Sequence, residues 1–318
     1  MAQMAPPESK SFQDVLVHYT SAQGLEGILR SNTLWATHSS HTNDGEELQI
    51  LKTILPKFSE LDSLFDERQR KDISLVTEAI QKRVDVYICS FSQTKKTEVY
   101  HQNNGRLSQW RAYGNYGIVF PLQKIEAMVN SISAAYNLGG AFGSGEIMYI
   151  DPDAPIPKDF NKNRLLFNYI LELGETVVET RTLEKCAVVL PTKSAFFEAA
   201  LFLKDKGFEE ENEYRLVLMH LKKDYLEAFH NTNTNGEKSR TFEDVNQFIE
   251  KYKNLTIRRD RIVPYIDFFQ HNPLPIEKIL IGPAPAGEQA ERKKTVEALL
   301  RHLDKDIPVV CSAIPYRG

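Results

Sequence analysis

The sequence has few cysteines, few tryptophans and no long hydrophobic run. Its three cysteines, Cys89, Cys186 and Cys311, lie far apart, which predicts reduced thiols rather than disulfides or a cysteine metal site. The longest apolar stretches fall far short of the ~20 residues that a membrane-spanning helix needs. Residues 1–10 contain neither the basic segment nor the apolar segment of a secretory signal. We therefore expect a cytoplasmic protein.

An excess of positive charge is missing as well. Lys and Arg number 39 against 43 Asp and Glu, so the net charge is −4. This balance argues against a protein whose main task is to coat nucleic acid, because that task needs a dense surface that neutralises phosphate. The densest basic segment, residues 251–261, is expected to form an ordinary solvated surface.

The local motifs of several large enzyme classes are also absent. The sequence has no Gly-x-Gly-x-x-Gly segment, no Walker loop, no Gly-x-Ser-x-Gly elbow and no zinc-protease helix. These absences remove Rossmann dehydrogenases, P-loop enzymes, α/β-hydrolases and metalloproteases from consideration. His38 and His41 could share a helical face, but no third ligand stands at the spacing of a zinc helix. We therefore expect no metal.

What is present is a globular composition, with 42% hydrophobic and 26% charged residues in a chain of 318. That length allows either two average domains or one large domain. Short apolar runs predict strands at residues 15–19, 33–37, 84–91, 117–120, 146–150, 212–219, 278–281 and 307–311. Amphipathic spacing predicts helices at residues 22–31, 107–113, 163–206, 242–252 and 289–303.

The order of these elements predicts the fold class. We expect residues 1–12 to be a flexible tail and residues 13–318 to form a single elaborated α+β domain, with a central mixed β-sheet and flanking helices. The last strand, helix and strand read as a β-α-β unit, whose two strands should be parallel with a right-handed crossover.

The strongest candidate site lies in residues 208–217, with sequence FEEENEYRLV. On an extended strand alternate side chains share a face, so Glu211, Glu213 and Arg215 would point the same way. Crowded carboxylates shift in pKa, and such groups are candidates for substrate binding or electrostatic catalysis. The spacing alone favours the alternative, which is a solvent-facing ladder of salt bridges.

Two short polar segments are further candidates. His18, Tyr19 and Thr20 end the first predicted strand, where α+β folds expose functional side chains, although a single histidine there more often belongs to a core. Asn43 and Asp44 precede a glycine and are typical of a turn, so they gain a functional meaning only with a partner elsewhere.

Aromatic residues gather around a glycine-containing turn at Trp110, Tyr113 and Tyr116, where core packing is the more frequent role. At the C-terminus we expect the chain to stay fixed beyond the last predicted strand. Tyr316 offers an apolar anchor, and Arg317 would then reach a defined place where its guanidinium could bind a carboxylate or a phosphate.

Taken together, these segments resemble the DUF2971 family, whose members occur in many bacteria. The matching blocks run in order along nearly the whole chain: His-Tyr-Thr at 18–20, Asn-Asp at 43–44, Cys-Ser-Phe-Ser at 89–92, Trp-x-x-Tyr at 110–113, Phe-x-x-Glu-x-Glu-Tyr-Arg at 208–215, Ile-Gly-Pro at 281–283 and Ser-x-x-Pro-Tyr-Arg at 312–317. The family label itself implies no activity.

A second, weaker resemblance is to the ADP-ribosyltransferase superfamily, whose members use NAD. It rests on a His-Tyr-Thr strand followed by a short helix, an aromatic second block and a late Glu on a strand. The resemblance implies an ADP-ribosyltransferase-like core. The long gap before the Glu and the extra C-terminal β-α-β unit depart from the minimal transferase fold.

The second resemblance also implies roles for particular residues. His18, together with Tyr19 and Thr20, would bind a ribose of NAD. Glu213 or Glu211 would bond the 2′-hydroxyl of the nicotinamide ribose and stabilise an oxocarbenium-like transition state. The aromatic contact to nicotinamide would come from Trp110, Tyr113 or Tyr116. An anion or substrate would be bound by Asn43, Asp44, Arg215 and Arg317.

The function that follows is NAD-dependent transfer of ADP-ribose to a protein or nucleic acid. In a toxin or defence setting, the expected partner is a cognate antitoxin or another protein. Two alternatives stay open. One is a non-catalytic module that senses a nucleotide, and the other is an NAD-independent enzyme that processes nucleic acid or phosphate.

Overall fold

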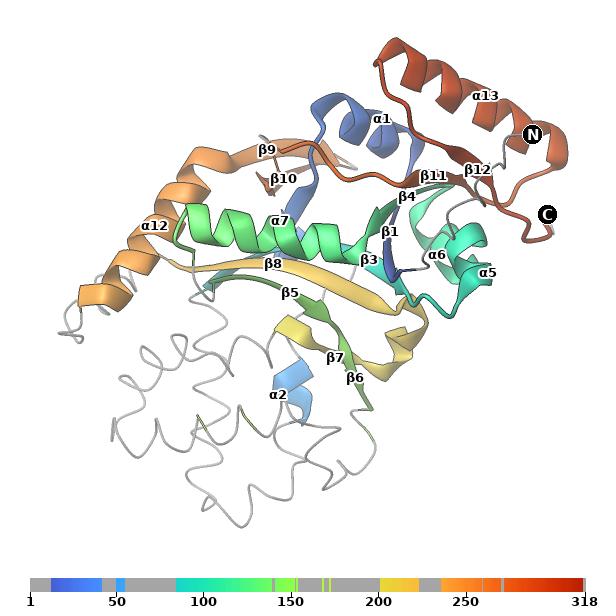
Figure 1. Ribbon diagram of the computed structural model, residues 1–318. Helices are drawn as coiled ribbons and strands as arrows, with labels where there is room; N and C mark the ends of the chain where they lie inside the picture. The colour runs from blue at the N-terminus through green and yellow to red at the C-terminus, as the bar shows by residue number, and fades with distance from the viewer. Residues whose placement is uncertain are drawn as a thin grey trace, which may run out of the picture. The chain divides into compact units, whose positions relative to one another are not determined.

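In the computed structural model, the chain is described over residues 13–41, 50–54, 84–138, 141–151, 153, 168, 172, 201–222, 236–258, 260–269 and 272–316 (Figure 1). The fold is α+β, with a large mixed β-sheet and several helices, which confirms the predicted class. The chain divides into two compact units. The tail of residues 1–12 lies outside the described residues, and a single domain with a transferase-like core stays a prediction.

The first unit comprises Met1–Arg30, Phe91–Glu126 and Leu274–Gly318. Its described elements are β1 (Val15–Thr20), α1 (Ala22–Ser31), the end of β3 (Val84–Thr94), α5 (Val99–Asn104), α6 (Leu107–Tyr113), β4 (Tyr116–Pro121), β11 (Lys278–Ile281), α13 (Ala286–His302) and β12 (Val309–Cys311). The strand order is β12-β11-β4-β1-β3. β11 and β12 are parallel, whereas the other neighbours are antiparallel, so the sheet is mixed.

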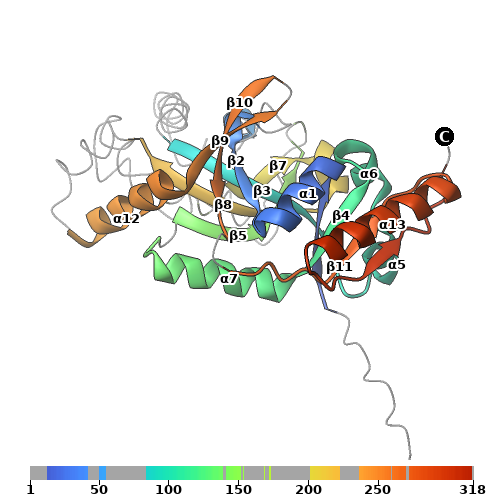
Figure 2. The same cartoon turned by 90° about the horizontal axis from the view of Figure 1, so that it is seen from above.

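The C-terminal β-α-β unit is confirmed. β11 pairs in parallel with β12, with Ile279 opposite Val309, and α13 provides the long connection that parallel strands require. Figures 1 and 2 both show α13 beside these two strands. The helix begins at Ala286, earlier than the sequence predicts, and the last strand begins at Val309 rather than at residue 307.

The core of the first unit forms around Trp110 of α6. Its indole packs with Val17 and Tyr19 of β1 and is buried, and its N–H donates a hydrogen bond to the Asn104 carbonyl at 2.9 Å. Gly105 has φ of 71°, and a Cβ there would lie 2.6 Å from the indole ring. Glycine is therefore required at this position by both the backbone and the close approach of the ring.

The second unit comprises Ser31–Ser90 and Ala127–Pro273. Its described elements are β2 (Trp35–His38), the 3-10 helix η1 (Ser39–His41), α2 (Ile50–Ile54), most of β3, most of α7 (Leu122–Ala135), β5 (Phe142–Glu146), β6 (Met148–Ile150), β7 (Leu203–Asp205), the 3-10 helix η5 (Lys206–Glu211), β8 (Glu213–Leu221), α12 (Gly236–Tyr252), β9 (Lys253–Arg258) and β10 (Arg261–Asp267). The strands follow the order β3-β2-β10-β9, and β8 pairs with both β3 and β5. β6 and β7 form a separate parallel pair.

α12 packs against β8 and β10 with one apolar face. Val245, Phe248, Ile249 and Tyr252 are buried on it, at the spacing of i, i+3, i+4 and i+7 that makes a helix amphipathic. None of the helices in the described part of the chain has both the length and the apolar character that a membrane crossing requires.

Two sequence predictions for the second unit are wrong. Residues 146–150 are not one strand, because β5 ends at Glu146 and β6 begins at Met148. The predicted helical segment 163–206 contains β7 near its end, and most of the rest lies outside the described residues. The basic segment 251–261 is largely exposed, as predicted, and it forms β9 and the start of an antiparallel hairpin with β10.

Candidate functional site

The strongest sequence candidate lies where η5 gives way to β8. Asn212 adopts a left-handed conformation, with φ of 44°, and ends the 3-10 helix. Glu211 therefore belongs to η5, not to the strand, which corrects the expectation that it alternates with Glu213 along an extended chain. Glu213 is the first residue of β8, and its backbone N–H donates a hydrogen bond to the Tyr149 hydroxyl at 2.8 Å.

The Glu213 carboxylate is held by four donor atoms. Arg215 shares its face of the strand, as predicted, and donates from Nε to Oε1 at 2.6 Å and from Nη2 to Oε2 at 3.0 Å. Lys204 donates from Nζ to Oε2 at 3.0 Å. Ser90 of β3, itself exposed, donates from Oγ to Oε1 at 2.6 Å. The carboxylate is thus fixed in position by groups from three strands.

Two further contacts complete the arrangement. Lys204 Nζ also lies 2.8 Å from Glu211 Oε2, and Arg215 Nη1 donates to the Leu201 carbonyl at 3.0 Å. The charges of the two cations and the two carboxylates therefore balance. We call this group the Glu213 cluster, and its members are Ser90, Lys204, Glu211, Glu213 and Arg215.

The charged side chains of Lys204, Glu213 and Arg215 are buried, so the predicted solvent-facing ladder is wrong. Glu213 is 5% exposed and Arg215 is 1% exposed. Burial by itself would raise the pKa of the Glu213 carboxyl, but the neighbouring Arg215 and Lys204 cations and the Ser90 hydroxyl lower it to about 2. Burial likewise opposes the charge of Lys204, but Glu213 and Glu211 raise the pKa of that ammonium above its usual range. Both groups therefore stay ionised at neutral pH.

The residues of the His-Tyr-Thr segment lie in β1 of the first unit. His18 is half-buried, and its ring meets the Phe91 ring edge-on with 5.7 Å between centroids. Tyr19 is buried against Trp110, with ring centroids 4.6 Å apart, and its hydroxyl accepts a hydrogen bond from the Arg106 backbone N–H at 2.8 Å. Burial raises the pKa of Tyr19 to about 12. Tyr19 and Trp110 thus serve the core.

The remaining aromatic candidates lie beside the same strand. Thr20, at the end of β1, pairs with Tyr116 at the start of β4. Tyr113, at the end of α6, packs against the core cluster that contains Val17. Tyr113 and Tyr116 are both half-buried, so each keeps surface through which it could contact a ligand.

Several predicted relations stay predictions. His18 belongs to the first unit and Glu213 to the second, so a shared cleft between them is not established. Asn43, Asp44 and Arg317 lie outside the described residues, as does Cys186. Of the other cysteines, Cys89 is a buried free thiol and Cys311 a half-buried one.

The C-terminal segment is fixed beyond the last strand, as predicted. The Ser312 hydroxyl donates to the Asn104 carbonyl at 2.8 Å, and the Ala313 N–H donates to Asn104 Oδ1 at 2.6 Å. Tyr316 does not act as the expected apolar anchor, because it is 52% exposed.

A second group of polar side chains surrounds Asp85, and the sequence did not point to it as a candidate site. Asp85 of β3 accepts a hydrogen bond from His38 Nε2 at 3.2 Å, and His220 Nε2 and Lys222 Nζ lie 3.7 and 3.6 Å from its two oxygens. The sequence suggests His38 only as a metal ligand, because Asp85 follows 47 residues later and no local spacing joins the two.

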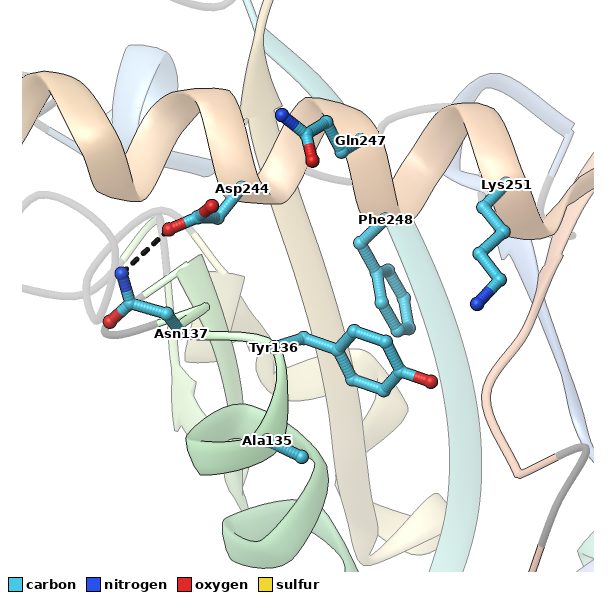
Figure 3. Close-up of a pocket in the computed structure, with 7 residues that line it drawn as sticks. All are labelled: Ala135, Tyr136, Asn137, Asp244, Gln247, Phe248 and Lys251. Atoms are coloured by element: carbon cyan, nitrogen blue, oxygen red, sulfur yellow. Dashed lines mark hydrogen bonds between the residues drawn. The ribbon is translucent and has the colours of Figure 1, made fainter.

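The second unit also has a pocket of about 330 Å³ between the end of α7 and α12 (Figure 3). The Asn137 amide bonds Asp244 Oδ2 at 2.6 Å at one end, and the Tyr136 and Phe248 rings meet beside it, with 4.9 Å between centroids. No residue predicted for the site lines this pocket.

No family model matches the chain, and neither a curated protein nor a solved structure does so. Both resemblances of the sequence therefore stay predictions. Over the described residues, no group of three or more His, Cys, Asp or Glu side chains is arranged to hold a metal ion.

Proposed function

We propose that the protein transfers ADP-ribose from NAD to a macromolecule, with Glu213 as the catalytic carboxylate. The observation that carries the proposal is that Glu213 is held ionised in a buried setting, where its carboxylate accepts a hydrogen bond from the exposed residue Ser90. A carboxylate with a fixed position and a fixed charge is what a reaction that develops positive charge requires.

The proposed chemistry breaks the bond between nicotinamide and the anomeric carbon of its ribose. The bonding electron pair leaves with nicotinamide, and positive charge develops on the ribose as in other glycosidic cleavages. The Glu213 carboxylate stabilises that charge. An acceptor nucleophile then bonds to the anomeric carbon and gives up its proton, which completes the transfer.

Arg215 and Lys204 have supporting roles in this proposal. Arg215 is buried and donates hydrogen bonds to the Glu213 carboxylate from two of its nitrogens. We therefore assign it to positioning Glu213 rather than to binding a substrate anion. Lys204 joins Glu213 to Glu211, which makes Glu211 a partner of the lysine and Glu213 the better candidate for catalysis.

His18, Thr20, Tyr113 and Tyr116, to which the second resemblance assigns the NAD contacts, are each half-buried and so keep some surface for a ligand. We assign Tyr19 and Trp110 to core packing, since both are buried and their polar atoms are already bonded. NAD would be consumed as a substrate, and the acceptor would be a protein or a nucleic acid.

The test is incubation of the pure protein with NAD labelled on its adenylate part, in the presence of a cell lysate. We expect nicotinamide release together with label transfer to a macromolecule. Ser90→Ala removes the hydroxyl that orients Glu213 and should slow release by roughly tenfold or more, because about 1.5–3 kcal/mol is typical of a hydrogen bond to a charged group. Glu210→Gln, at an exposed carboxylate of η5, is the matched control and should leave the rate unchanged.

The outcomes separate the alternatives. Release without label transfer would identify an NAD hydrolase. NAD binding without release would favour the nucleotide-sensing module, to which a charge-balanced and fully bonded Glu213 is also suited. The absence of both NAD binding and nicotinamide release would overturn the proposal.

A further inference from the structure

A hydrogen-bonded group on the second unit lies apart from the Glu213 cluster. It consists of Asp85 on β3, His38 at the end of β2, and Ser40 and His41 in η1. We call these four residues the His38 site.

The two groups lie on opposite faces of the sheet. Asp85 and Ser90 are separated by an odd number of positions on β3, and so are Glu213 and His220 on β8. Because side chains alternate along a strand, Asp85 and His220 project from the face opposite to that of Ser90 and Glu213. The His38 site is therefore not a part of the Glu213 cluster.

The contacts of His38 determine which ring nitrogen carries the proton. The Ser40 backbone N–H donates to Nδ1 at 3.3 Å, so Nδ1 is an acceptor in the neutral ring. Nε2 then carries the proton and donates it to Asp85 Oδ1 at 3.2 Å. Ser40 Oγ lies 2.8 Å from the same Nδ1, within reach for donating its own proton.

His41 holds the serine oxygen from the other side. Its Nδ1 lies 2.8 Å from Ser40 Oγ, and a hydroxyl has only one proton to give. With that proton directed to His38, the His41 N–H serves as the donor to Ser40 Oγ. The hydroxyl oxygen is thus fixed between two imidazoles, and Ser40 is exposed.

Asp85 is suited to orient and charge-stabilise the imidazole. Burial would raise its pKa, but the His38 hydrogen bond and the nearby His220 and Lys222 lower the pKa of this carboxyl below its usual range. Tyr87, the next residue on the same face of β3, meets the His38 ring edge-on at 5.2 Å between centroids and restricts its plane. An ionised and partly buried carboxylate behind a fixed imidazole is the arrangement that activates a serine.

Two buried polar atoms beside this group have no hydrogen-bond partner in the described part of the chain. They are the Tyr87 hydroxyl and His220 Nδ1. Buried polar atoms are normally satisfied, and an unsatisfied one calls for a water, a ligand or a catalytic role. Both belong to side chains that contact His38 or approach Asp85.

We propose that the His38 site is a second catalytic centre, a serine nucleophile that hydrolyses small acyl esters. Ser40 Oγ bonds to the ester carbonyl carbon while its proton moves to His38 Nδ1. The ester C–O bond then breaks, and the departing alkoxide takes that proton as an alcohol. Water, deprotonated by His38, attacks the acyl-serine, and the carboxylic acid leaves as Oγ regains its proton. The reaction consumes one ester and one water and needs no oxidant or metal.

The roles within this centre follow from the contacts. Ser40 is the catalytic nucleophile and His38 the catalytic base. Asp85 is a positioning residue, since it acts through His38 and fixes its tautomer. The exposed position of Ser40 fits small substrates that approach from solvent.

The first test uses the full chain with p-nitrophenyl acetate and, separately, with a fluorophosphonate probe followed by peptide mapping. We expect a burst of nitrophenol that matches the protein concentration, and the probe on Ser40. Ser40→Ala should abolish both signals. Ser39→Ala changes the same residue type in the same 3-10 helix and serves as the matched control, with burst and labelling retained.

A second variant tests the positioning role. Asp85→Asn should reduce the rate of acylation by at least ~100-fold, because the amide favours the wrong tautomer of His38, while the far-UV circular dichroism stays unchanged. Absence of labelling and of hydrolysis above the buffer rate in the wild type would overturn the proposal. Labelling or a burst that survives Ser40→Ala would overturn it as well, and so would a folded Asp85→Asn variant of undiminished rate.

Discussion

Substitution of Glu213 by glutamine tests the electrostatics of the Glu213 cluster through stability. The amide keeps the shape of the side chain but removes the charge that Arg215 and Lys204 neutralise. The pKa of this carboxyl falls from 4.5 to about 2, and the difference corresponds to about 3 kcal/mol of the free energy of unfolding at pH 7. Removal of one partner from a buried ion pair costs a similar amount, about 3–5 kcal/mol.

The pH dependence of this contribution has a defined sign. Between pH 4.5 and about 2 the unfolded state binds a proton at residue 213 and the folded state does not, so stability is lost as the pH falls through that window. The assay is urea unfolding of the wild type and of Glu213→Gln, followed by far-UV circular dichroism from pH 7 to pH 3. The difference between the two free energies of unfolding should be constant above pH 5 and shrink below it.

The control is Glu210→Gln, which removes an exposed carboxylate from the same segment and should change stability by less than about 0.5 kcal/mol. A Glu213→Gln variant as stable as the wild type at pH 7 would refute the reasoning. So would a large difference in stability that does not change between pH 7 and pH 3.

Three further outcomes are expected. Gly105→Ala should lower the free energy of unfolding by roughly 1–3 kcal/mol in a urea titration, because a Cβ at φ of 71° would also lie 2.6 Å from Trp110. Burial lowers the pKa of the His220 imidazole to about 4, so the folded state resists its protonation and the protein loses stability as the pH falls from about 6.5 to 4. His220→Phe should remove this loss of stability, which melting temperatures measured across that pH range would show. Asn104→Ala should speed amide hydrogen exchange at Ala313 by roughly tenfold, since it removes the acceptor that holds this N–H, and an unchanged rate would contradict the assigned contact.

Local patterns predicted several of the regular elements, although α7 (Leu122–Ala135) and α5 (Val99–Asn104) were missed. The apolar run of β1 and the amphipathic helix before β12 identified their segments, because a buried strand is apolar throughout and a helix against a sheet is apolar on one face. The β9–β10 hairpin was missed because its exposed positions are rich in charge and its apolar residues Leu255, Ile257 and Ile262 are themselves exposed. Leu255 and Ile257 do alternate with polar residues, but the surrounding charges favoured a solvated surface over a strand.

The site was only partly predictable for a different reason. The shared face of Glu213 and Arg215 follows from strand alternation, but the burial of the pair depends on Lys204 and Ser90, which come from other strands. Glu211 lies outside the strand that was predicted for it, because Asn212 takes a left-handed conformation that separates η5 from β8. Asparagine tolerates this conformation better than most residues. Contacts between distant segments cannot be derived from spacing along a single strand.

The central claim is that Glu213 stabilises positive charge during cleavage of NAD. The most direct measurement is the rate of nicotinamide release from NAD at pH 7 by the wild type and by Glu213→Gln, each verified as folded by circular dichroism. We predict that the variant is slower by roughly 100-fold or more, which corresponds to about 2.7 kcal/mol for one electrostatic group. Equal rates for the two proteins, or a wild-type rate no higher than that of NAD alone, would contradict the claim.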